Sequence, residues 1–207
     1  MNRFQPFVYT HSFDVVALTE TWLTDNIMDK EILPSGYYVY RSDRPSRGGG
    51  VMIAVSSRIS SRLLKSHSSI DMVSVELLVP PNPIISCIYV PPRSPICYLK
   101  EIFHFLEDPT LSNRKLILLG DFNAPDINWS TLTASDTTSQ LLCDLVFQNN
   151  LTQLVTKPTH VKGNTLDLLI TNTSNDITNI VVCNHLSTLS SDHHMITFDL
   201  ASNSMFH

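Results

Sequence analysis

Short apolar runs of four to eight residues recur along the whole chain, separated by Pro, Gly, Asn and Ser. Runs of this length, bounded by turn residues, predict buried β-strands. Residues 72–79 also alternate between apolar and other side chains, as a strand with one apolar face does. That face carries Val73, Val75, Leu77 and Val79. The predicted strands cover residues 14–20, 37–41, 50–57, 72–79, 84–90, 115–123, 151–155, 165–171, 179–183 and 194–200.

Two segments, residues 97–107 and 137–150, have apolar side chains at the spacing of a helix instead. We expect Thr137 or Thr138 to cap the second helix. The predicted apolar stripes are Leu99, Ile102, Phe103 and Leu106 in the first helix, and Leu141, Leu142, Leu145 and Val146 in the second.

The order of these elements constrains the fold. Many strands lie between few helices, and short turns such as residues 80–83 predict antiparallel hairpins. A doubly wound parallel sheet would need a crossover between most strands. The pattern therefore favours an α/β fold in which a sandwich of two mixed β-sheets is flanked by helices.

The composition excludes several classes of protein. With 43% apolar and 16% charged residues, the 207-residue chain is not intrinsically disordered and can bury a sizeable core. No apolar run approaches the roughly 20 residues that span a bilayer, and residues 1–9 lack a signal-peptide pattern. The net charge of -5 argues against a protein that coats nucleic acid, but not against an enzyme that touches a few phosphates.

The cysteines indicate a reducing compartment. They show no zinc-ligand spacing, and each lies in or beside an apolar run, which predicts buried free thiols. These residues are Cys87, Cys97, Cys143 and Cys183.

Polar side chains lie at the ends of three predicted strands, where position is well fixed. They are Glu20, Asp121, Asn123, Ser191, Asp192 and His193. A carboxylate at the end of a buried strand is poorly solvated unless it meets a cation or hydrogen-bond donors. Carboxylate and amide oxygens suit Mg²⁺, and a neighbouring histidine can act as an acid or base. Together these groups predict a site for metal-assisted attack of water on a phosphate ester.

Each residue also has a structural interpretation. Glu20 alone is more simply the solvated end of a strand, and Asp121 and Asn123 are typical of a turn. His193, beside another histidine, is typical of a surface pair. The occurrence of TETWL, GDFN and SDHH in this order in one domain favours the catalytic interpretation.

The chain resembles the endonuclease/exonuclease/phosphatase superfamily, whose fold is that of deoxyribonuclease I, over nearly its whole length. GDFN and SDH are typical of the superfamily, whereas ETWL, YVPPRS and NTLDLLITN resemble the endonuclease domain of non-LTR (LINE-type) retrotransposons. This resemblance implies a four-layer α/β/β/α sandwich. The matching segments are FDVVALTETWL, GYYVYRSDR, GGGVMIAV, CIYVPPRS, LILLGDFNAPDINW, LVTKPTHVKGNTLDLLITN and LSSDHHMITFDL.

The resemblance implies roles for the first group of site residues. Glu20 corresponds to a metal-binding glutamate. Asp121 corresponds to the aspartate that positions or activates the attacking water. Tyr89 and Asn123 correspond to groups that hold the scissile phosphate. The implied cofactor is Mg²⁺, or Mn²⁺.

The remaining site residues follow from the same resemblance. His193 corresponds to a histidine that contacts the phosphate. Asp192 corresponds to an aspartate that binds the metal or orients that histidine. Asp167 matches a supporting position that orients the site, and Ser191 adjoins the Asp-His pair.

Three further residues are candidates for DNA contact. Arg93 follows Tyr89 closely, and His160 lies on a loop that approaches DNA in the family. Arg44 lies in the polar loop before the GGGV segment, where a solvated hairpin is the simpler interpretation and contact with the phosphate backbone the alternative.

The start of the chain departs from the family pattern. The family fold begins with a strand that carries an asparagine, and residues 1–13 do not match it. This segment resembles the following helix, with Phe4, Phe7 and Val8 on one face. We therefore expect a single domain over residues 1–201 that lacks its first strand and has an exposed apolar sheet edge, followed by a tail at 202–207.

The leading functional hypothesis is a Mg²⁺-dependent endonuclease that nicks DNA and leaves a 3′-hydroxyl for reverse transcription. Such domains are normally fused to a reverse transcriptase, which these 207 residues do not include. One alternative is a catalytically impaired remnant with weak or no nucleic-acid binding. Another is a phosphatase or phosphodiesterase of the same superfamily, against which TETWL and YVPPRS argue. The expected location is intracellular, and nuclear if the protein is functional, with no membrane partner.

Overall fold

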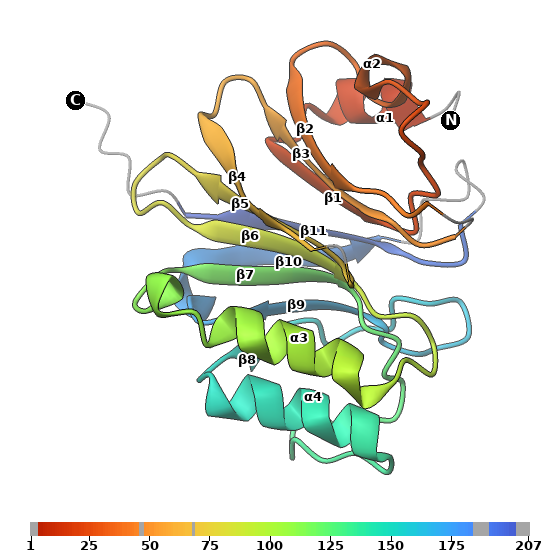
Figure 1. The fold of residues 1–207 in the computed structure, drawn as a ribbon, viewed down its shortest axis with the longest axis vertical. Coiled ribbons are helices and arrows are strands. Elements are labelled where there is room, and N and C mark those ends of the chain that lie inside the picture. Colours follow the sequence, from red (N-terminus) through yellow and green to blue (C-terminus); the bar gives the residue numbers. More distant parts are fainter. Residues whose placement is uncertain (1–3, 46–47, 68, 184–190, 202–207) are drawn as a thin grey trace.

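Two stacked β-sheets form the centre of the molecule, and helices cover their outer faces (Figure 1). The computed structural model describes residues 4–45, 48–67, 69–183 and 191–201. One outer layer holds α1 (Phe4–His11) and α2 (Asp29–Ile32), and the other holds α3 (Ile96–Leu106) and α4 (Thr137–Gln148). The predicted α/β/β/α sandwich is therefore confirmed. Two short 3₁₀ helices lie at Pro109–Leu111 and Ser174–Asp176.

The larger sheet has six strands in the order β4-β5-β6-β7-β9-β8. β6 and β7 are parallel and are connected through α3, whereas the other neighbours are antiparallel. Its strands are β4 (Ser61–Ser66), β5 (Asp71–Leu77), β6 (Ile84–Tyr89), β7 (Leu116–Asp121), β8 (Thr152–Gln153) and β9 (Asp167–Thr171). β4 was not predicted, because none of its residues is buried and this edge strand lacks an apolar run.

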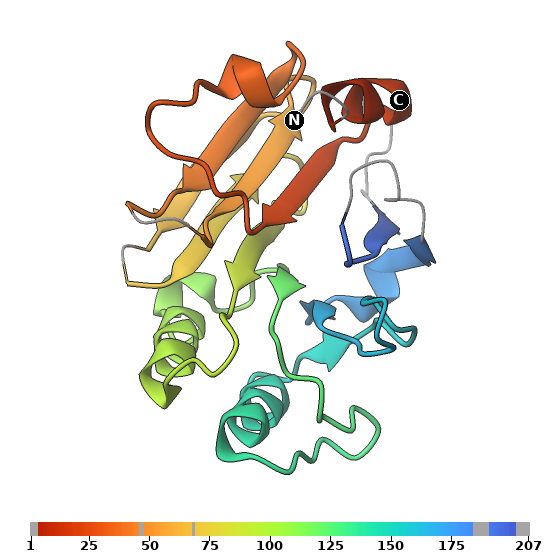
Figure 2. The same cartoon turned by 90° about the vertical axis from the view of Figure 1, so that its right-hand side faces the viewer.

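The smaller sheet is antiparallel, in the order β1-β3-β2, and β10 and β11 form a separate antiparallel pair. These strands are β1 (Val15–Thr19), β2 (Tyr37–Ser42), β3 (Val51–Ser56), β10 (Ile177–Cys183) and β11 (Met195–Leu200). Among the described residues, β1 pairs only with β3, and β11 only with β10. Figure 2 shows β1 (red) and the β10–β11 pair (blue) on the same side of the sandwich, with a gap between them. Every residue of β1 is partly exposed.

Three apolar clusters hold the layers together. One lies between the two sheets, one between the large sheet and α3 with α4, and one beneath α1 and α2. Val73, Val75 and Leu77 pack between the sheets, as predicted. Met72 packs on the opposite face against the helix layer, so both faces of β5 are buried rather than one. Local alternation does not show that a second layer covers the other face of a strand.

The helices confirm the predicted segments but correct two details. In α3, Phe105 is buried and Phe103 only partly so. Asp136, and not Thr137 or Thr138, caps α4, and its carboxylate accepts hydrogen bonds from the backbone N–H groups of Thr138 at 2.9 Å and Ser139 at 3.0 Å. The predicted helical face near the N-terminus is confirmed, since the side chains of α1 pack into the third cluster.

The cysteines only partly match the prediction of buried thiols. All four are free, and Cys87 and Cys143 are buried. Cys183 is partly exposed, and Cys97 is exposed in the first turn of α3, where one side of the helix faces solvent. Among the described residues, no helix has the length and apolar character needed to cross a bilayer. The predicted tail at 202–207 lies outside the described residues.

Candidate active site

Four neighbouring strands of the large sheet place a polar residue at the same level. Tyr89, the last residue of β6, is paired in register with Asp71 of β5 on one side and with Asp121 of β7 on the other. Asp121 is in turn paired with Asp167, the first residue of β9. Side chains at paired positions share one face of a sheet, so these four residues form a row. Tyr89 packs in the cluster between the sheets, so the row faces the smaller sheet.

Asp121 lies at the centre of this row and is 2% exposed. Its carboxylate accepts hydrogen bonds from Asn123, from the backbone N–H at 3.0 Å and from the side-chain amide at 2.8 Å. Burial raises its pKa to about 7, and the charges of Asp167 and Glu20 add to this effect, whereas the N–H of Asn123 and the charge of His193 oppose it. A carboxylate that titrates near neutral pH is well suited to accept a proton from water.

The preceding residue, Gly120, allows Asp121 to reach this position. Gly120 has a φ of +137°, and a Cβ atom built on it would lie 1.8 Å from the carbonyl oxygen of Ile88 in the adjacent strand. We predict that Gly120→Ala will lower the free energy of unfolding by about 3 kcal/mol or more, because the backbone of β6 or β7 must move. Chemical denaturation measures this loss. A stability equal to that of the wild type would show that the strands are not this close.

His193 extends the row from the side of Asp167. Its Nδ1 lies 2.8 Å from a carboxylate oxygen of Asp167, so the other ring nitrogen is not used in this pair. The hydrogen bond with Asp167 raises the pKa of His193 to about 9 against the opposing effect of burial, and the charges of Asp121 and Asp192 also raise it. The imidazole is therefore a cation at neutral pH, a state that favours contact with a phosphate.

Asp192 and His160 form a second hydrogen-bonded pair beside His193. The Nδ1 of His160 accepts the backbone N–H of Lys162 at 3.1 Å, which places the ring proton on Nε2. That Nε2 lies 3.2 Å from the carboxylate of Asp192, whose pKa is lowered by its own backbone N–H and by this bond. His160 is only 7% exposed. This placement favours support of Asp192 over the predicted DNA contact. Next to this pair, Ser191 Oγ accepts the backbone N–H of His193 at 3.1 Å.

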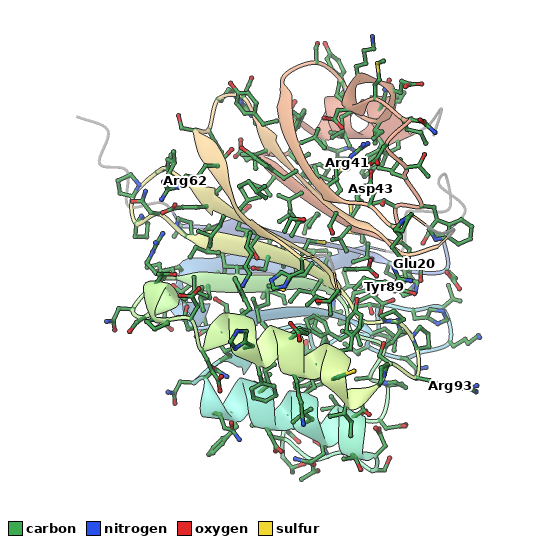
Figure 3. All side chains as sticks on the ribbon, in the orientation of Figure 1. Glu20, Arg41, Asp43, Arg62, Tyr89 and Arg93 are labelled. Carbon is green, nitrogen blue, oxygen red and sulfur yellow. The ribbon has the colours of Figure 1, made fainter. Side chains whose placement is uncertain are left out.

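Glu20 reaches the row from the smaller sheet. It follows β1 with a positive φ of 50°, and the indole N–H of Trp22 donates to its carboxylate at 3.3 Å. The backbone N–H groups of Thr21 and Trp22 donate to the glycine loop before β3. Burial raises the pKa of Tyr89. A hydrogen bond with the side chain of Glu20 and the negative charge of Glu20 raise it further. Figure 3 shows Glu20 and Tyr89 at the same end of the sheets.

The oxygen atoms of this site suit a hard divalent cation. The charges of Glu20 and Asp167 both raise the pKa of Asp121, and a bound cation would relieve this repulsion. Among the described residues, His160, Asp192 and His193 also place possible ligand atoms within 4.8 Å of one another. Both ring nitrogens of His160 are already hydrogen-bonded, however, so the oxygen-rich set of residues fits Mg²⁺ or Mn²⁺ better.

The predicted arginines differ in their placement. Arg44 is partly buried, pairs with Asp71 through two nitrogens and lies 5.9 Å from the centre of the Tyr89 ring. Arg93 is exposed on the loop after β6 and extends away from Tyr89 (Figure 3). Asp71 was not predicted as a site residue, because it lies at the start of its strand and carries no motif of its own. Only the register of β5 with β6 reveals it.

Solved structures share this fold at low sequence identity. The endonuclease domain of TRAS1, a telomere-specific non-LTR retrotransposon, has a TM-score of 0.74 at 18% identity, over 97% of this chain and 91% of that domain. The 3′-5′ exonuclease NExo from Neisseria meningitidis has a TM-score of 0.74 at 16% identity, over 96% and 93%. An AP endonuclease from Archaeoglobus fulgidus has a TM-score of 0.67 at 16% identity, over 94% and 91%.

The sandwich, with acids at its strand ends and an Asp-His pair, is that of the endonuclease/exonuclease/phosphatase superfamily, whose members are nucleases and phosphatases that generally depend on divalent metals. The profile of the family described as "Endonuclease-reverse transcriptase" matches residues 84–197, more than half of the chain, and the chain belongs to this family. A comparison with curated proteins finds no match.

Proposed function

We propose that this protein is a divalent-metal-dependent endonuclease that nicks DNA and leaves a 3′-hydroxyl. The observation that carries the proposal is the convergence of Asp121 and the Asp167–His193 pair in one row, with Glu20 beside it from the other sheet. Membership in a family of endonucleases associated with reverse transcriptases supports DNA as the substrate. The proposal includes a natural fusion to a reverse transcriptase and action in the nucleus.

The side chains divide the work of hydrolysis as follows. Asp121 accepts the proton of a water whose oxygen attacks phosphorus, while the bond from phosphorus to the 3′-oxygen breaks. The departing 3′-oxygen takes a proton from solvent water, which leaves a 3′-hydroxyl and a 5′-phosphate. Asn123 holds the carboxylate of Asp121 in place through two N–H groups. The cationic ring of His193 and the hydroxyl of Tyr89 stabilise the negative charge that grows on the phosphate oxygens.

Glu20 and Asp192 are the residues that we propose hold the cation. When bound, a divalent cation neutralises phosphate charge and lowers the pKa of nearby water. Two observations support this assignment. Glu20 and Asp192 both offer carboxylate oxygens, and the charge of Glu20 raises the pKa of Asp121, a repulsion that a bound cation would relieve.

A supercoiled-plasmid nicking assay tests the proposal. The wild-type protein with Mg²⁺ is expected to convert supercoiled DNA to the open-circular form, and Asp121→Ala or EDTA to reduce the rate at least about a thousandfold. No nicking above the Asp121→Ala control would contradict the proposal and favour a catalytically impaired remnant. Hydrolysis of a soluble phosphoester without DNA cleavage would favour a phosphatase of the same superfamily.

A further inference from the structure

Asp71 is a buried carboxylate in the row of site residues, and the proposed hydrolysis does not use it. It is 4% exposed. The guanidinium of Arg44 donates to both of its oxygens, from Nε at 2.8 Å and from Nη2, and the backbone N–H of Gly50 donates at 3.3 Å. A buried carboxylate needs such donors. Here they come from the connection between β2 and β3, whose glycine carbonyl groups also accept hydrogen bonds from the two backbone N–H groups after Glu20.

The pair with Asp71 holds the Arg44 guanidinium at a partly exposed position. Asp71 engages Nε and Nη2, so this pair does not use Nη1. The Arg44 side chain is 33% exposed, against 5% for that of Asp71, so the guanidinium is open to solvent on one side. A Cβ atom at Gly49 would lie 2.5 Å from Arg44 Nε, so the guanidinium occupies space that a side chain at position 49 would fill. An arginine held along one edge by a carboxylate can offer its other edge to a phosphate.

Asp71 is also connected to Tyr89 through Tyr98. The backbone N–H of Asp71 donates to the Tyr98 hydroxyl at 2.6 Å, and that hydroxyl donates to the Tyr89 carbonyl oxygen at 2.7 Å. The guanidinium of Arg44 in turn lies over the Tyr89 ring. The link to Tyr89 uses the backbone N–H of Asp71, which Asp71→Asn keeps, so this variant weakens the hold on Arg44 and leaves the link to Tyr89 in place.

Glu76 provides a matched comparison on the same strand. It is also 4% exposed and pairs with two arginines, Arg62 at 2.6 Å and Arg114. Figure 3 shows Arg62 at the opposite end of the sheets from Glu20 and Tyr89. Glu76 thus has the burial and pairing of Asp71 without its proximity to the site.

We infer that Asp71 is a positioning residue that holds the Arg44 guanidinium beside Tyr89, so that Arg44 contacts a backbone phosphate of the DNA substrate. This inference rests on the proposed function for the identity of the substrate. It assigns to Asp71 an action through Arg44 and no contact with the substrate.

Steady-state nicking of a duplex oligonucleotide by four variants tests this inference. Asp71→Asn and Arg44→Gln are each expected to raise KM about tenfold, the effect of a lost charge-assisted phosphate contact, with kcat changed less than about threefold. The Asp71→Asn/Arg44→Gln double variant is expected to resemble the single variants, because all three lose the same contact. Glu76→Gln is expected to lower the thermal unfolding midpoint without changing KM or kcat.

The outcomes separate this inference from the proposed function. A KM for Asp71→Asn equal to that for Glu76→Gln would overturn the positioning role, and so would multiplicative effects in the double variant. Anisotropy of a labelled duplex, with Ca²⁺ in place of Mg²⁺, measures binding without cleavage. One outcome would separate the two claims: the wild type binds the duplex but does not cleave it, and binding is weakened in Asp71→Asn and Arg44→Gln but not in Glu76→Gln. The proposed function would then fail, and the positioning role would stand.

Discussion

His193→Gln is expected to lower the rate of DNA nicking by about a thousandfold, because it removes the cation that the proposed mechanism places next to the phosphate. The hydrogen bond with Asp167 raises the pKa of His193 to about 9, so the wild-type ring is charged over the working pH range. Glutamine keeps a polar side chain but cannot carry that charge. Initial rates of plasmid nicking in Mg²⁺ measure the loss, and it is expected in kcat rather than in KM.

His194 offers a matched control for this variant. It is the next residue in the chain, and its ring contacts the carbonyl oxygen of Pro158 at 3.3 Å rather than an acid of the row. His194→Gln is therefore expected to nick DNA at close to the wild-type rate. Equal losses in the two variants would indicate disruption of the segment and would remove His193 from the mechanism.

Asp121→Asn is expected to abolish nicking while making the metal-free protein more stable above pH 7. Burial raises the pKa of Asp121 to about 7 from its ordinary value of 3.8, so the folded state keeps a proton that the unfolded state releases at lower pH. Ionisation of this group therefore costs stability progressively as the pH rises from about 4 to about 7, and the full cost is present above pH 7. That cost is up to about 4 kcal/mol in the wild type. Asp121→Asn removes this cost but also loses a hydrogen bond to Asn123, which lowers the net gain in stability by about 1 kcal/mol.

Denaturation in EDTA at pH 5 and at pH 8.5 measures this effect. The gain in stability of Asp121→Asn over the wild type is expected to be larger at pH 8.5, and Mg²⁺ is expected to stabilise the wild type more than the variant. A stability difference that does not change with pH would contradict the raised pKa. The combination of lost activity and gained stability would show that the negative charge of Asp121 destabilises the fold but is required for the reaction.

Much of the fold is predictable from the sequence, because strand and helix periods are local. The hairpin between β5 and β6 follows from a turn between two apolar runs, and the helix α1 follows from the resemblance to the family together with one apolar face. The edge strand β4 and the cap of α4 do not, because the first lacks an apolar run and several residues could cap the second. The burial of β5 on both faces depends on the helix layer, which the pattern within the strand does not report.

The candidate site divides in the same way. Acids at the ends of apolar runs mark Glu20 and Asp121, and the turn of Asn123 back to Asp121 spans only two residues. Asp71 carries no such mark, and the pairing of His160 with Asp192 joins residues 32 positions apart. The raised pKa of Asp121 depends on charges contributed by several strands.

The sequence by itself determined most of the elements, the positions of the central acids and the family, because each depends on residue order over a few positions. Only the tertiary structure decided which residues support those acids and which protons they hold. Strand register and burial set these properties, and both arise from contacts between segments that are distant in the chain.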